Sequence, residues 1–166
     1  SNNSFVQLTH SFKDSDIVGG LVSEEGYEYF QDRIMFPYLQ GNRTLYLIGR
    51  QTDKTPKDKY SQAKYLKLKT DYLENPIFNI DSLKNSKELF ITEGIADCIS
   101  LDQTGYACIS PVTIQFKKSD YPALLKYSKG KTVYLANDNE SNQQGEEGAV
   151  ATALYLFKNG IVNVQI

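Results

Sequence analysis

The chain has 166 residues, a formal net charge of −2, 40% hydrophobic residues and 23% charged residues. This length fits one domain, or one domain with a substantial appended subdomain, and the composition is typical of a globular protein that buries a core. A membrane span is excluded, because no apolar run approaches the roughly 20 residues that cross a bilayer, and no signal-peptide pattern is present.

The first half of the chain lacks a regular alternation of elements. A helix-like pattern begins at residue 11 and stops at Gly19, and an apolar run follows at 34–38. Residues 42–50 alternate apolar and polar side chains after a turn, which predicts a strand. Residues 51–76 are polar and rich in lysine, and their pattern assigns no element to them.

From about residue 86 onward, strand and helix patterns alternate. The expected strands are "ELFIT", "YACIS", "TVYLAN" and "IVNVQI", and the expected helices lie at 95–103, within 119–130 and within 145–160. Alternation with short connections predicts a mostly parallel sheet covered by helices on both faces. The functional crevice of such a sheet lies at the carboxyl ends of its strands.

Two acids follow the first of these strands. Glu93 ends the strand, Gly94 lets the backbone turn closely, and Asp97 falls in the first turn of the next helix. A helix N-terminus favours an acid by up to ~1 kcal/mol, so Asp97 is either a helix-start acid or a ligand. Acids are poor strand residues, and Glu93 is therefore a functional candidate.

A second acidic pair, Asp138 and Glu140, follows the strand "TVYLAN". Alternate residues of an extended segment point to the same side, and two carboxylates so close repel unless a cation neutralises them. A solvated loop explains the pair equally well, but Glu93 on another strand of the same sheet favours a metal site. Glu146 and Glu147 begin a helix, where they are expected to be surface acids.

The scarcity of other catalytic residue types points the same way. His10 is the single histidine, so a Ser-His-Asp or Cys-His catalytic group would depend on it, and a zinc site lacks ligands. Cys98 and Cys108 are expected to be buried free thiols of an intracellular, cytoplasmic protein. Any chemistry is therefore expected to use carboxylates with Mg²⁺ or Mn²⁺.

Lysines cluster ahead of the regular region. Residues 53–69 contain six lysines against two aspartates, a local charge of +4. Such a basic track suits the phosphates of a single strand, and the interleaved Tyr60, Tyr65 and Tyr72 could stack on bases. A solvated loop with tyrosines in a half-buried strand explains the same residues.

Several stretches resemble the catalytic core of DnaG-type bacterial and phage-like DNA primases. A strand, Glu-Gly-x-x-Asp and a helix, followed two strands later by Asp-x-acid, resemble the Toprim domain over residues 86–166. "RIMFP" at 33–37, "LIGR" at 47–50 and "AKYLK" at 63–67 resemble the segment ahead of Toprim in bacterial replicative primases. The resemblance implies an α/β fold: a Rossmann-like Toprim domain at 86–166, preceded at 1–85 by a smaller, basic, mixed α+β subdomain that faces template and nucleotide.

The resemblance also implies roles for individual side chains. Family members are proposed to use the first glutamate as general base or metal ligand, and further acids gather Mg²⁺ or Mn²⁺. The matching acids are Glu93, Asp97, Asp138 and Glu140. Basic positions face template or nucleotide phosphates, and charge alone adds two more lysines. The basic set is Arg33, Arg50, Lys64, Lys67 and Lys69.

Three departures from the family pattern stand out. Glu140 replaces the usual second aspartate, Gly145 comes later than the family's glycine, and the chain stops at the fourth strand. We therefore expect a Toprim domain truncated at its C-terminal end, in a fragment of a larger primase that is weakly active or inactive by itself.

The expected function is DNA-directed synthesis of RNA primers by metal-assisted nucleotidyl transfer. Its partners would be a single-stranded DNA template, ribonucleoside triphosphates and, through regions absent from this sequence, a replicative helicase; no membrane is involved. Two alternatives share the acidic cluster. One is a Toprim-type metal-dependent nuclease, and the other is a non-catalytic Toprim module that binds DNA or a partner.

Overall fold

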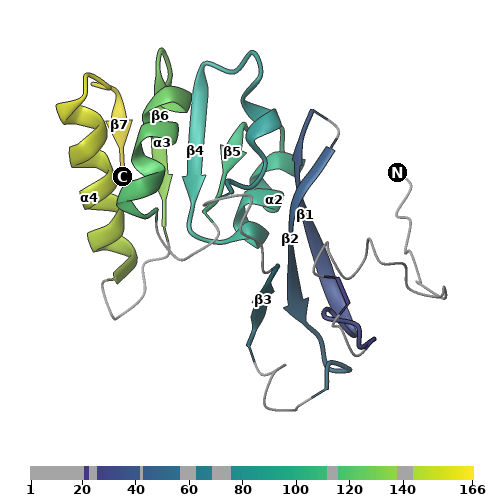
Figure 1. Ribbon diagram of the computed structural model, residues 1–166. Helices are drawn as coiled ribbons and strands as arrows, with labels where there is room; N and C mark the ends of the chain where they lie inside the picture. Colours follow the sequence, from purple (N-terminus) through teal and green to yellow (C-terminus); the bar gives the residue numbers. More distant parts are fainter. Residues whose placement is uncertain are drawn as a thin grey trace. The chain divides into compact units, whose positions relative to one another are not determined.

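The computed structural model describes residues 21–22, 26–41, 43–56, 63–68, 76–111, 116–137 and 144–166 (Figure 1). The chain divides into two compact units. The first comprises Ser1–Phe36 and Leu47–Tyr72, and the second comprises Pro37–Tyr46 and Leu73–Ile166. None of the helices in these described ranges has the length and apolar character to cross a membrane. The expected division at residue 86 into two functional domains stays a prediction.

An antiparallel sheet of three strands has the order β1-β2-β3. Strand β1 covers Arg33–Gln40, β2 covers Arg43–Gln51 and β3 covers Tyr65–Lys67. The predicted strand at 42–50 is confirmed as β2, and the apolar run at 34–38 lies inside β1. The short β3, in the lysine-rich segment without an assigned element, pairs Tyr65 with Arg50. The helix-like pattern at 11–18 lies outside the described residues.

Glycine at position 49 is required by the packing on β2. A Cβ at this position would lie 2.7 Å from Cδ1 of Phe30 and 3.0 Å from Cδ of Arg33. Both distances are shorter than the roughly 3.5 Å at which carbon atoms begin to repel. The glycine of "LIGR" therefore lets two side chains from the preceding segment cross the strand.

The second unit contains a parallel sheet of order β5-β4-β6-β7, which confirms the predicted mostly parallel sheet. Its strands are Glu88–Thr92 (β4), Cys108–Ile109 (β5), Thr132–Ala136 (β6) and Val164–Gln165 (β7). Its α-helices are Ile95–Gln103 (α2), Tyr121–Ser128 (α3) and Gln144–Lys158 (α4), and its 3₁₀ helices are Ile80–Leu83 (η1) and Lys118–Asp120 (η2). Strands β5 and β7 are shorter than the sequence pattern predicts.

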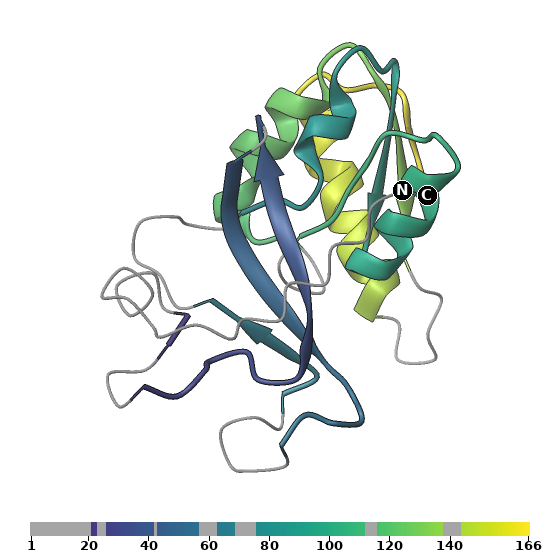
Figure 2. The same ribbon diagram turned by 90° about the vertical axis from the view of Figure 1, so that its right-hand side faces the viewer.

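Helices cover both faces of the parallel sheet, as the alternation of elements predicts (Figure 2). On one face, alternate residues of β4 and β6 point into the main core, where they meet Leu124 of α3 and Leu156 of α4. On the other face, Phe90 stacks on Tyr134 with ring centroids 4.6 Å apart. Helix α2 lies on that second face, where its Cys98 contacts Cys108 of β5.

The tip of the β1–β2 hairpin belongs to the second unit and is held there by specific contacts. Tyr38 is buried and its ring lies 5.2 Å from that of Phe78, edge to face. The amide of Gly41 donates to Oδ2 of Asp81 at 2.7 Å, and Asp81 also pairs with Lys84 at 3.0 Å. Hydrogen bonds with the Lys84 side chain and the Gly41 amide lower the pKa of Asp81.

Candidate functional site

Glu93 lies where the polypeptide leaves β4 for α2, and side chains hold this turn. Its Oε2 atom is buried. Beneath it, Thr92 is 1% exposed, and its hydroxyl donates to the carbonyl of Gly94 at 3.0 Å. The hydroxyl of Ser110, which follows β5, donates to the Glu93 carbonyl at 3.3 Å. The turn that carries Glu93 is therefore tied to the end of the neighbouring strand.

Asp97 is the third residue of α2, and its carboxylate folds back over Gly94. A Cβ built on Gly94 would lie 2.5 Å from Oδ2 of Asp97, so glycine leaves room for the carboxylate. An acid in this position is favoured by the helix dipole. The exposed Asp97 is thus placed as a helix-start acid, and its role as a metal ligand stays a prediction.

The end of β6 lies beside the end of β4. Thr92 and Ala136 are partners in the parallel ladder, so both strands reach the same edge of the sheet. Glu93 follows Thr92 by one residue, and in the sequence Asp138 follows Ala136 by two. Asp138 and Glu140 lie outside the described residues. Within the described residues, no group of three or more histidines, cysteines and acids could hold a metal ion.

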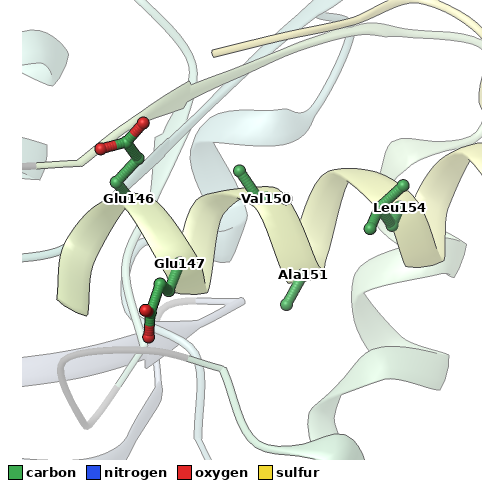
Figure 3. A pocket seen from close by; sticks show the side chains of 5 residues that line it. All are labelled: Glu146, Glu147, Val150, Ala151 and Leu154. Carbon is green, nitrogen blue, oxygen red and sulfur yellow. The ribbon is translucent and has the colours of Figure 1, made fainter. Parts of the chain in front are cut away.

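The acids at the start of α4 lie on the protein surface. Glu146 and Glu147 are both exposed, and Figure 3 shows their carboxylates pointing away from each other on different sides of the helix. They border a shallow hollow on α4 that continues along Val150, Ala151 and Leu154. Their positions agree with the expected surface acids that offset the helix dipole.

Arg33 is bound to the backbone of its own unit. Its Nη1 atom donates to the carbonyl oxygens of Gly49 at 3.3 Å and Ala63 at 2.9 Å. The guanidinium therefore joins β2 to the segment that leads into β3. A contact between Arg33 and a phosphate stays a prediction, which would have to use its other nitrogen atoms.

Two of the other predicted basic residues lie near one aromatic ring. The Arg50 guanidinium carbon lies 5.8 Å and the Lys64 ammonium nitrogen 6.0 Å from the centre of the Tyr65 ring. These distances are at the outer range of cation–π attraction. Lys67 ends β3 and is half-buried, while Lys69 lies outside the described residues. The first unit thus places two cations near the ring of a half-buried tyrosine.

Sequence reasoning missed two residues that shape this region. Thr92 supports the Glu93 turn, because its buried hydroxyl donates to the Gly94 carbonyl. The sequence signal for this role was a threonine directly before Glu-Gly at the end of a strand. Asn79 adopts a left-handed conformation with φ of 63°, and its side-chain amide donates to Oδ1 of Asp102 at 3.0 Å and to the Cys108 carbonyl at 3.2 Å. Asparagine is among the few residues that tolerate this backbone conformation.

The two cysteines are buried free thiols, as predicted. The hydrogen bond between the two thiols, and then burial, raise the pKa of Cys98. The same hydrogen bond lowers the pKa of Cys108, because Cys108 is the acceptor.

No family model matches the chain, and no curated protein matches it. Solved structures of primases are similar to the chain. The Aquifex aeolicus primase, with its zinc-binding and RNA polymerase domains, is 18% identical with a TM-score of 0.61, over 81% of this chain and 33% of that one. The RNA polymerase domain of Mycobacterium tuberculosis primase DnaG, in complex with a double-stranded DNA oligomer with a 6-nucleotide overhang, is 14% identical with a TM-score of 0.67, over 86% and 48%.

A third similar structure is the DnaG primase catalytic domain bound to single-stranded DNA. It is 20% identical with a TM-score of 0.62, and the match covers 82% of this chain and 44% of that one. The chain therefore spans between a third and a half of these primase structures. At this identity the likeness shows the fold: a mixed α/β architecture, with a parallel and an antiparallel sheet, like that of primase catalytic cores.

Proposed function

We propose that the chain belongs to a primase catalytic core that joins ribonucleotides on a single-stranded DNA template. In this proposal the second unit contains a Toprim-type domain, and the first unit contacts template and nucleotide. The observation that carries the proposal is the register of β4 and β6. Because Thr92 pairs with Ala136, Glu93 and the chain leading to Asp138 leave adjacent strands at the same edge.

The acidic residues offer the ligand type that a hard divalent cation prefers. Carboxylate oxygens are the ligands that Mg²⁺ and Mn²⁺ prefer, and the described part of the site supplies Glu93 and Asp97 within one turn of chain. Asp138, Glu140 and Asp97 would hold the cation, which would supply charge neutralisation at the triphosphate and a lower pKa for the primer 3′-hydroxyl. Glu93 would accept the proton of that hydroxyl or complete the ligand set.

The first unit supplies groups suited to a single strand. Arg50 and Lys64 would contact phosphates, and Tyr65 beside them would stack on a base. Arg33, Lys67 and Lys69 would extend this basic surface. Each phosphate neutralised would contribute about −0.7 to the slope of log affinity against log salt concentration.

The proposal is tested with Glu93→Gln, measured against Glu88→Gln as a matched control. Glu88 begins the same strand and is exposed, and a glutamine there still accepts a hydrogen bond from Tyr134. With template, ribonucleotides and Mg²⁺, Glu93→Gln should lower primer synthesis about 100-fold or more, while Glu88→Gln should leave it within about twofold. The assay uses this chain and the full open reading frame that encodes it.

Two other outcomes would replace the proposal. Cleavage of DNA that needs Mg²⁺ but no ribonucleotides would identify a Toprim-type nuclease. DNA binding in both proteins without primer synthesis, cleavage or saturable Mn²⁺ binding would identify a non-catalytic module. Equal primer synthesis by the wild type and Glu93→Gln would remove Glu93 from the mechanism.

A further inference from the structure

Cys98 and Cys108 face each other between α2 and β5. Their Sγ atoms are 3.1 Å apart, and both residues are 0% exposed. A disulfide bond is about 2.05 Å long, so the two sulfurs need to approach by roughly 1 Å to form one. These are the two cysteines of the chain, and the fold places them side by side.

The two thiols differ in their hydrogen bonds. The Cys98 thiol donates to Sγ of Cys108, and the Cys108 thiol donates to the Cys98 carbonyl at 2.9 Å. The Asn79 side-chain amide lies 3.7 Å from Sγ of Cys108 and 4.0 Å from Sγ of Cys98, with its hydrogens directed at Asp102 and the Cys108 carbonyl. A donor directed at a sulfur stabilises its thiolate, which is the reactive form of cysteine. Cys108, whose sulfur accepts the hydrogen bond from Cys98, is therefore the thiol of the pair that is suited to attack an oxidant.

The pair is buried outside the main core. Neither cysteine belongs to the apolar cluster between the sheet, α3 and α4. Asn79, which contacts both sulfurs, is half-buried and is hydrogen-bonded to the exposed Asp102. A movement of the Asn79 side chain would let a molecule as small as a peroxide reach Cys108.

We propose that Cys98 and Cys108 form an oxidisable dithiol site that takes a peroxide as its substrate. The Cys108 thiolate attacks one oxygen of hydrogen peroxide, so that an S–O bond forms, the O–O bond breaks and the departing hydroxide takes a proton to become water. The Cys98 sulfur then attacks Cys108, the S–S bond forms, the S–O bond breaks and a second water leaves. Two thiols are oxidised to one disulfide, and one peroxide is reduced to two waters.

Two buried cysteines can also be nothing more than small apolar residues, and an equilibrium measurement separates the two cases. The folded chain is equilibrated with mixtures of reduced and oxidised glutathione, and the same is done in 8 M urea, as a chosen denaturing condition. Intact mass then gives the fraction that has lost two hydrogens. If the fold pre-positions the sulfurs, the disulfide should be at least about tenfold more favourable in the folded chain than in urea.

By linkage, the oxidised protein should then resist denaturant more than the reduced one, by about 1.4 kcal/mol for each factor of ten. Peroxide should produce the same loss of two hydrogens in the folded protein, with Cys98 and Cys108 in one cross-linked peptide pair. Cys98→Ala and Cys108→Ala, each leaving one thiol, should abolish this product. A disulfide less favourable in the folded chain than in urea, a lower unfolding midpoint on oxidation, or only glutathione adducts and over-oxidised single thiols would overturn the proposal.

Discussion

Replacing Gly49 by alanine tests the packing that holds the first unit together. The added Cβ would lie 2.7 Å from Cδ1 of Phe30, and 3.0 Å and 3.2 Å from Cδ and Cβ of Arg33. Carbon atoms pack best at about 3.5–4.0 Å, so three contacts are too short by roughly 0.3–0.8 Å or more. Overpacking of this kind costs about 1–3 kcal/mol, and we expect Gly49→Ala to fall in the upper half of that range.

The predicted loss should appear where β2 pairs with the following segment. The amide of Gln51 donates to the Lys64 carbonyl at 2.9 Å, and that of Leu68 to the Leu47 carbonyl at 3.1 Å. Hydrogen exchange at these two amides therefore reports the opening of the first unit, and Gly49→Ala should accelerate both by one to two orders of magnitude, the rate equivalent of about 2 kcal/mol.

The double variant supplies the control. In a Phe30→Ala background the shortest contact is gone, so the added methyl should cost at least about 1 kcal/mol less than in the wild type. Contacts with Arg33 remain, and the relief should be incomplete. Unchanged exchange in Gly49→Ala, or costs that simply add in the double variant, would refute this account of the glycine.

Three further predictions concern the second unit. The Gly41 amide resonance should titrate with a midpoint below the ordinary aspartate pKa of 3.8, because the pKa of Asp81 is lowered in the folded protein. The stabilising hydrogen bond from Gly41 to the Asp81 carboxylate is fully present above pH 3.8 and is lost as the pH falls through the folded pKa. Lys84→Ala removes a group that lowers this pKa and should therefore raise the midpoint. The hydrogen bond to Glu88 raises the pKa of Tyr134, so the phenolate absorbance that appears above pH 10 should appear at lower pH in Glu88→Gln. Thr92→Val removes the hydroxyl that donates to the Gly94 carbonyl, and it should lower the free energy of unfolding, measured by denaturant titration, by about 1–2 kcal/mol. The control Thr132→Val, at the start of β6, should lower it by less than half as much.

The periodic part of the chain was predictable from sequence because its elements carry their own signals. Helix α2 occupies the predicted range 95–103, where a strand-end glycine and the Thr104-Gly105 stop define both ends. Strand β3 was not predictable, since three residues in a polar, lysine-rich segment show no period. Its structure depends on pairing with β2, which is a long-range contact.

Side-chain contacts between distant segments were the other part that sequence patterns could not give. Gly41 and Asp81 are 40 residues apart, and nothing local marks them as partners. The contacts of Arg33 could not be predicted from the sequence either. A sequence pattern does not distinguish an arginine that binds phosphate from one that binds backbone carbonyls. The fold shows that Arg33 donates to two backbone carbonyls.

The central claim is that acids from separate parallel strands meet at one edge of the sheet and hold one divalent cation. Paramagnetic broadening by Mn²⁺ tests it most directly, because the effect reports distance from the ion at every amide. The account predicts saturable binding that broadens Gly94 at the end of β4 and Asn137 after β6 together, and that is lost in both Glu93→Gln and Asp138→Asn. Broadening centred instead on Glu146 and Glu147, or no saturable binding, would contradict it.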